Sequence, residues 1–134
     1  YFAHQEEIDL CWRIINSGKK VYYTYKAKVY HVGGATLNKN NPQKTYLNIR
    51  NNLSTLLKNL PFPKLIGLIF VRLCLDGVAG VYFGLKMGFP HLWAVVRAHF
   101  AFYAQLPGTI KRRGKHQINN YYQTKGLIFK HFLK

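Results

Sequence analysis

The stretch Gln5-Glu6-Glu7-Ile8-Asp9-Leu10-Cys11-Trp12-Arg13 directs the fold assignment, because it holds three of only four carboxylate side chains among 134 residues. The fourth acid is Asp76. Against 20 lysines and arginines in the whole chain, this run is a local island of negative charge. A basic protein that gathers its acids in one place needs them there, so the run is the first candidate for chemistry.

The net charge of +16 at pH 7 is far larger than folding requires. A charge of this size implies an anionic partner, such as a phosphate-bearing substrate, a nucleic acid or an acidic membrane surface. The length suits one domain or parts of two, and it is sufficient to bury a core. The chain begins at Tyr1 and its first residues resemble the interior of a fold, so we expect the C-terminal part of something larger.

Periodicity and turn residues predict both helix and strand in the first sixty residues. Residues 5–17 predict a helix with acids in its first turn, where the helix dipole favours them, and with Gly18 as its end. Apolar residues on two sides of this helix predict burial on both sides. Residues 20–25 and 27–32 are rich in β-branched and aromatic side chains and predict two short strands. A helix over 42–60 is predicted to begin at a proline.

Beyond Pro61 the composition becomes strongly apolar, and we place the main boundary of the chain there. Residues 65–85 are long enough to span a bilayer. They contain Arg72 and Asp76, whose spacing of four predicts a neutralised pair on one helix face. Length favours a spanning helix and the two charges favour one that lies in the membrane interface, so both arrangements stay open.

The last third of the chain predicts close helix packing followed by a basic tail. Gly80 and Gly84 form a pair of small residues four apart, which lets helices approach closely. A second apolar helix is predicted over 92–106, with Pro107 and Gly108 as its end. The tail from Thr109 holds seven lysines or arginines and no acid.

Taken in order, these residues resemble the C-terminal end of a family 2 glycosyltransferase. The resemblance rests on the acidic run, then His31-Val32-Gly33-Gly34, Lys44-Thr45-Tyr46 and Arg50-Asn51-Asn52. The helical remainder is similar to the membrane-associated extensions of bacterial members. The resemblance implies an α/β piece of an inverting GT-A nucleotide-sugar transferase domain over 1–60, and a helical membrane-associated region over 61–134.

In that family the chemistry is hexosyl transfer, with inversion, from a nucleotide-sugar to a cell-envelope glycan or lipid-linked acceptor. The second acid of the pair, here Glu7, is the implied general base, which removes the proton of the acceptor hydroxyl as it attacks the anomeric carbon. Glu6 stays open as the alternative base. Asp9, Arg13 and Trp12 are implied to support the motif.

The resemblance also implies a divalent metal, Mg²⁺ or Mn²⁺, in the full-length enzyme to steady the leaving diphosphate. His31 matches a position that can approach this metal and the diphosphate. The family's nucleotide-binding half and its Asp-x-Asp motif precede the matched region, and residues 1–134 contain no Asp-x-Asp. We therefore expect this fragment alone not to turn over a nucleotide-sugar.

Simpler structural explanations exist for each of these residues. The glutamates can be solvated first-turn acids, His31 a hydrogen-bonded structural histidine, and Trp12 a core residue. The whole ordered set favours the catalytic interpretation of the glutamates, whereas for His31 the structural and the site interpretation both stay open.

A second class of function is a non-catalytic, basic membrane-surface protein, and a weaker third is a nucleic-acid-binding module. The tail lacks regular aromatic interleaving and any nucleic-acid motif, so we predict no nucleic-acid partner. Following two apolar helices, the tail favours contact with anionic lipid at the cytoplasmic face of the bacterial inner membrane. The predicted contact residues are Lys111, Arg112, Arg113 and Lys115.

Overall fold

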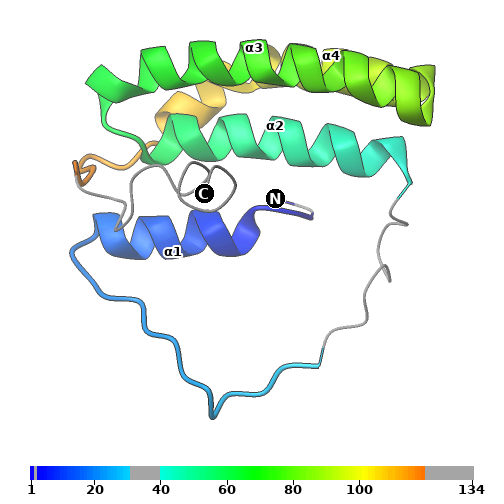
Figure 1. Ribbon diagram of the computed structural model, residues 1–134. Helices are drawn as coiled ribbons and strands as arrows, with labels where there is room; N and C mark the ends of the chain where they lie inside the picture. The colour runs from blue at the N-terminus through cyan, green and yellow to red at the C-terminus, as the bar shows by residue number, and fades with distance from the viewer. Residues whose placement is uncertain (2, 31–39, 120–134) are drawn as a thin grey trace, which may run out of the picture.

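The computed structural model describes residues 1, 3–30 and 40–119, and four α-helices make up the regular structure of that part of the chain. They are α1 (Glu6–Asn16), α2 (Pro42–Asn59), α3 (Phe62–Met87) and α4 (Phe89–Lys111). Figure 1 shows α2 as the middle element, with α1 on one side and the antiparallel α3–α4 pair on the other. Packing follows this order, because α2 lies against α4 and α3, and α1 lies against α2.

Local signals place most helix ends where the sequence predicts them. The side chain of Asn41 accepts a hydrogen bond of 2.8 Å from the Gln43 amide, and Pro42 occupies the first turn of α2. Gly18 has a φ of +78° directly after α1, a conformation that glycine adopts without strain. The break at Pro61 is confirmed, because α2 ends at Asn59 and α3 begins at Phe62.

The predicted end of the last helix at Pro107 is wrong. This proline lies inside α4, which continues to Lys111. A proline removes only one amide donor from the helix ladder, and here the Thr109 hydroxyl donates to the Gln105 carbonyl at 2.9 Å. Thr109 is buried, so the extra turn is also held by packing.

The α/β fold class and the GT-A piece predicted for residues 1–60 are wrong, since the described residues contain helices and no β-strand. The predicted strand 20–25 and most of 27–32 run as exposed chain, with Tyr23 92% and Tyr30 94% exposed. Aromatic and β-branched residues form a strand only where a neighbouring strand supplies hydrogen bonds and a packed face. No segment within the described ranges does so. Residues 31 and 32 lie outside those ranges.

The core lies where α2 meets the α3–α4 pair, so its residues come from both sides of Pro61. The buried cluster contains Ile49, Leu53, Leu57, Leu60, Leu65, Val95, Ala98 and Phe102. Burial of α1 on two sides, by contrast, is wrong: Ile8 is 52% and Leu10 is 49% exposed. One face of α1 contacts α2, and no described element covers the other. The division into two parts at Pro61 stays a prediction.

Close approach of α3 and α4 at the paired glycines is confirmed. A Cβ atom added at Gly84 would lie 3.1 Å from Leu92 Cβ, and one added at Gly80 would lie 3.3 Å from Val95. Both contacts are tighter than ordinary van der Waals distances, so glycine is what allows the two helices to pack along each other.

Candidate functional site

The three clustered acids have different environments on α1. Asp9 is 4% exposed, whereas Glu6 and Glu7 are exposed in the first turn of the helix. Within the described ranges no ion pair involves either glutamate. The helix dipole stabilises their negative charge at this position. Glu6 and Glu7 are therefore the carboxylates that remain free to meet a ligand.

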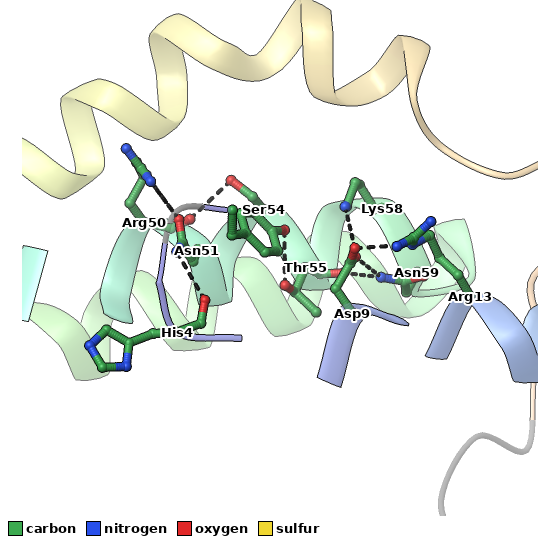
Figure 2. A network of polar contacts seen from close by, with 10 residues as sticks. His4, Asp9, Arg13, Arg50, Asn51, Ser54, Thr55, Lys58 and Asn59 are labelled. Atoms are coloured by element: carbon green, nitrogen blue, oxygen red, sulfur yellow. Dashed lines mark hydrogen bonds and ion pairs between the residues drawn. The ribbon is translucent and has the colours of Figure 1, made fainter. Parts of the chain in front are cut away.

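Asp9 anchors α1 to α2 through a polar network (Figure 2). Its carboxylate accepts hydrogen bonds from Lys58 Nζ at 2.7 Å, Asn59 Nδ2 at 2.9 Å and Arg13 Nε at 3.1 Å. The predicted pairing of Asp9 with Arg13 is confirmed. Because every donor in this network is held by one buried carboxylate, Asp9 acts as a positioning residue for the first turn of α1.

The chain enters α1 through two consecutive residues in the left-handed region, His4 with a φ of 67° and Gln5 with a φ of 71°. Asn51 Nδ2 holds this turn by donating to the carbonyls of Ala3 at 2.7 Å and His4 at 3.0 Å. Arg50 in turn donates to Asn51 Oδ1 through Nε at 3.0 Å and Nη2 at 2.8 Å. The hydrogen bonds from Asn51 hold this strained turn in place. The turn in turn sets the direction in which the first residues of α1, Glu6 and Glu7, leave it.

Glu7 lies beside a shallow, largely apolar groove on the uncovered side of α1, with a volume of about 340 Å³. The groove is lined by Glu7, Ile8, Cys11, Trp12 and Ile15. Glu6 does not line it. Trp12 also packs against the core cluster, so its ring links the groove to the bundle interior.

Tyr1 extends the polar network along the same face of α2. Its hydroxyl lies 2.9 Å from Thr55 Oγ1, and Lys58 Nζ lies 4.8 Å from the centroid of its ring. Burial raises the pKa of the Tyr1 phenol to about 12, partly offset by the hydrogen bond with Thr55. The phenol is therefore neutral at physiological pH and serves as a hydrogen-bonding and packing group.

The predicted metal contact, His31, lies outside the described residues. Within the described ranges no three His, Cys, Asp or Glu side chains come close enough together to hold a metal ion. Glu6 and Glu7 are too few ligands for Mg²⁺ or Mn²⁺ without further oxygen donors. The divalent metal expected in the full-length enzyme stays a prediction.

The outer face of α3 carries a long row of exposed apolar side chains. Between Lys64 and Lys86 no exposed residue of α3 is charged. The helix is long and apolar enough to cross a membrane, with a mean hydropathy of 1.9, and only 17% of its most apolar window is buried inside the bundle. Its exposed large side chains are Phe62, Ile66, Leu68, Phe70, Val71, Leu75, Val78, Val81, Tyr82, Leu85 and Met87.

The charges between Lys64 and Lys86 are paired, with Asp76 buried and the Arg72 side chain 38% exposed. Arg72 Nη2 lies 2.9 Å from Asp76 Oδ1, so the predicted pair is confirmed, and Asp76 is 2% exposed. The structure adds His99 from α4, whose Nε2 lies 3.6 Å from Asp76 Oδ2. Pairing with Asp76 neutralises the charge of Arg72 within α3.

The four basic residues predicted to contact lipid separate into two groups. Lys111, Arg112 and Lys115 are exposed. Arg113 instead turns inward and donates to the backbone carbonyls of Leu57 and Leu60 at the end of α2, and burial lowers the pKa of its guanidinium. Arg113 therefore caps the carbonyl end of α2, as a cation at a helix C-terminus does.

Sequence reasoning missed the role of the polar residues of α2. Asn51, Thr55 and Asn59 are each at most 1% exposed. Their side chains form hydrogen bonds with the first residues of the chain and with α1. Their spacing of four on a helix with an apolar core face was the available signal. The central residue of Arg50-Asn51-Asn52, a segment of the resemblance, is therefore a buried structural residue.

Comparison of the chain with protein families, with curated proteins and with solved structures finds no match. The resemblance to family 2 glycosyltransferases is corrected on this ground and on the fold. A GT-A piece requires strands of a sheet, whereas the described residues form helices only. What the described residues define is an α-helical bundle with one membrane-type surface and one anchored acidic helix.

Proposed function

We propose that this protein docks on a membrane through the outer face of α3. The observation that carries the proposal is the stretch of exposed, uncharged side chains between Lys64 and Lys86. Large exposed apolar patches on a protein mark interaction sites, and a hydropathy of 1.9 over a helix of this length is typical of contact with lipid.

The packing of the bundle favours a helix that lies in the plane of the membrane. Figure 1 shows α3, α2 and α1 side by side, with α1 on the far side of α2. A spanning α3 would bring Glu6, Glu7 and Arg13 to the depth of the hydrocarbon, where charges are costly. With α3 in the plane, its apolar face enters the bilayer and these charged groups of α1 stay in water.

The charge of the chain selects the kind of lipid. A net charge of +16 is attracted to anionic headgroups, and each lysine or arginine near such a surface contributes about 1 kcal/mol. Lys64 and Lys86 lie at the two ends of the apolar face, where their charges reach the headgroup layer. This supports docking on an anionic leaflet, and we place it at the cytoplasmic face of the bacterial inner membrane.

The test is labelling of single cysteines on sealed vesicles of mixed neutral and anionic phospholipid. Lys64→Cys and Lys86→Cys are each made in a background where Cys11 and Cys74 are replaced by serine. The protein is added from outside, and a membrane-impermeant maleimide follows. In-plane docking predicts that both cysteines react from outside, at similar rates.

Two outcomes contradict the proposal. Protection of one cysteine until the vesicles are permeabilised would mean that α3 spans the bilayer. Absence of protein from the vesicle fraction at low salt would mean that the apolar face serves another partner. Vesicles of neutral lipid alone are the matched control, and they are expected to retain less protein because the electrostatic attraction is missing.

A second candidate is transfer of a sugar from a nucleotide-sugar to a glycan or lipid-linked acceptor, with Glu7 as general base. The observation that favours it is the exposed carboxylate of Glu7 beside the groove of α1, on a helix fixed by the Asp9 network. A base of this kind deprotonates an acceptor hydroxyl. A membrane-bound protein would meet such a lipid-linked acceptor in the plane of the bilayer.

Glu7→Gln tests this candidate in the protein as the cell makes it. Sugar transfer is expected to fall at least about a hundredfold, because the amide cannot take up the hydroxyl proton. Glu6→Gln is the matched control, one residue away and equally exposed, and is expected to keep most of the activity. Equal activity in the Glu7→Gln variant and the wild-type protein would contradict the role of Glu7.

A further inference from the structure

Basic side chains collect at one end of the bundle, where the C-terminal ends of α1, α2 and α4 meet. They line a pocket of about 270 Å³, to which α1 contributes Arg13, α2 contributes Lys58, and the residues directly after α4 contribute Arg112, Lys115 and His116. A water molecule takes about 30 Å³ in the liquid, so this space holds a group much larger than one water.

A second pocket, of about 200 Å³, adjoins the first along α2. Arg50 and the hydroxyls of Ser54 and Thr109 line it, and Lys58 and Arg112 line both pockets. The two neighbouring spaces share the cations Lys58 and Arg112, which suits a ligand with two linked anionic groups.

The cations of these pockets outnumber the acids that neutralise them. Among the residues that the structure describes, the carboxylate in contact with these cations is Asp9, which is buried and bound to Arg13 and Lys58. Within the described ranges, Arg112 and Lys115 have no ion pair. The positive charges of Arg112 and Lys115 are therefore not neutralised by this carboxylate. They lie near Lys58, whose Nζ is 2.7 Å from Asp9 Oδ2.

Capping of helix ends does not account for these cations. Arg113 already serves the carbonyl end of α2 by donating to Leu57 and Leu60. At the end of α1, the backbone amides of Ser17, Gly18 and Lys19 donate to the last free carbonyls. Arg112 and Lys115 are left with their donors directed at the pocket or at solvent.

We propose that these two adjoining pockets bind the diphosphoryl group of a ligand. The planar fork of an arginine and the compact charge of a lysine are the side chains that recognise phosphate oxygens. The ligand is either a phosphate-bearing lipid headgroup or a soluble phosphate compound, since both present the same oxygens. The site is assigned to a discrete ligand, and the proposal does not depend on docking of α3.

Calorimetric titration of the whole chain with inorganic pyrophosphate, without lipid and at constant ionic strength, tests the site. Wild-type protein is expected to bind saturably with one pyrophosphate per chain. The Arg112→Gln/Lys115→Gln variant is expected to bind at least about tenfold more weakly, because two charge-assisted contacts are lost. Both replaced side chains are exposed, so folding is expected to be retained, as circular dichroism checks.

Lys111→Gln is the matched control, because it removes the same charge from an exposed residue that lines neither pocket. Its affinity for pyrophosphate is expected to equal that of the wild type. The proposal is overturned if pyrophosphate shows no saturable binding, or if loss of Lys111 weakens binding as much as loss of Lys115. Either result would mean that anions are attracted by the net positive charge of the protein and not by a discrete binding site.

A competition arm distinguishes the two sources of the phosphate. If the ligand is a lipid headgroup, vesicles that contain phosphatidic acid displace pyrophosphate from the wild-type protein, and vesicles of equal charge made with phosphatidylglycerol displace less. If the ligand is soluble, neither vesicle displaces pyrophosphate. Both results support the site, because saturable binding and its loss in the double variant decide whether the site exists.

Discussion

Replacing Val78 and Leu85 by aspartate is expected to abolish binding to anionic vesicles. Both residues belong to the outer face of α3, where they are 69% and 82% exposed and seven positions apart on one stripe. Each substitution removes about 2 kcal/mol of apolar burial in lipid and adds the cost of a charge at the membrane. The lost apolar burial alone, about 4 kcal/mol, lowers the partition coefficient roughly 10³-fold, and the two charges lower it further.

A charge-matched pair of substitutions separates the apolar face from the net charge. Tyr22→Asp/Tyr23→Asp also lowers the net charge by two, from +16 to +14, at residues that are 79% and 92% exposed and lie away from α3. This variant is expected to bind vesicles nearly as the wild type does, with only the modest loss that two charges cause. Equal losses in both variants, measured by vesicle sedimentation, would show that attraction to lipid is electrostatic alone.

Asp9→Asn is expected to lower the free energy of unfolding by about 3 kcal/mol. Breaking a buried ion pair from one side leaves the partner charge uncompensated, and Lys58 Nζ loses the carboxylate 2.7 Å away while its side chain is only 15% exposed. Because Asp9 anchors α1 to α2, the loss is concentrated in that helix. Trp12 lies in α1 and Trp93 in α4. The tryptophan fluorescence of variants that keep only one of the two therefore shows which helix detaches first in urea.

Two further variants complete this experiment. Glu6→Gln removes an exposed acid from the same helix turn and is expected to cost less than about 1 kcal/mol, the usual value of a dipole interaction. Lys58→Met in the Asp9→Asn background is expected to recover part of the loss, because the unpaired cation is removed. If Asp9→Asn costs no more than Glu6→Gln, the network does not anchor α1.

The helices could be predicted because their signals are local. Pro42, Gly18 and the break at Pro61 act through the backbone of their own neighbours, and the apolar period of α2 marks a face that one helix displays by itself. The pair Arg72 and Asp76 was predictable for the same reason, since a spacing of four places both on one helix face. His99 joins them from another helix, which spacing along the chain could not indicate.

The strands and the site depended on contacts that a sequence does not display. Residues 20–30 have the composition of a strand, but a strand exists only beside a partner, and none is present in the described ranges. The acidic run predicted a supporting role for Asp9 and a catalytic one for Glu7 or Glu6, and packing against α2 decided that Asp9 is buried while both glutamates are exposed. Which acid would meet Lys58 could not be predicted, because Asp9 and Lys58 are 49 positions apart along the chain.

The amino-acid sequence by itself determined the helices of the described chain, the apolar character of α3 and the excess of positive charge, because each depends on neighbouring residues or on composition. Only the tertiary structure decided that Asn51, Thr55 and Asn59 are interior braces and that Lys58 and Arg112 share two pockets. Burial and pocket formation depend on which helix ends meet in space. That meeting follows from the packing of α2 against α1 and α4, and no local rule specifies it.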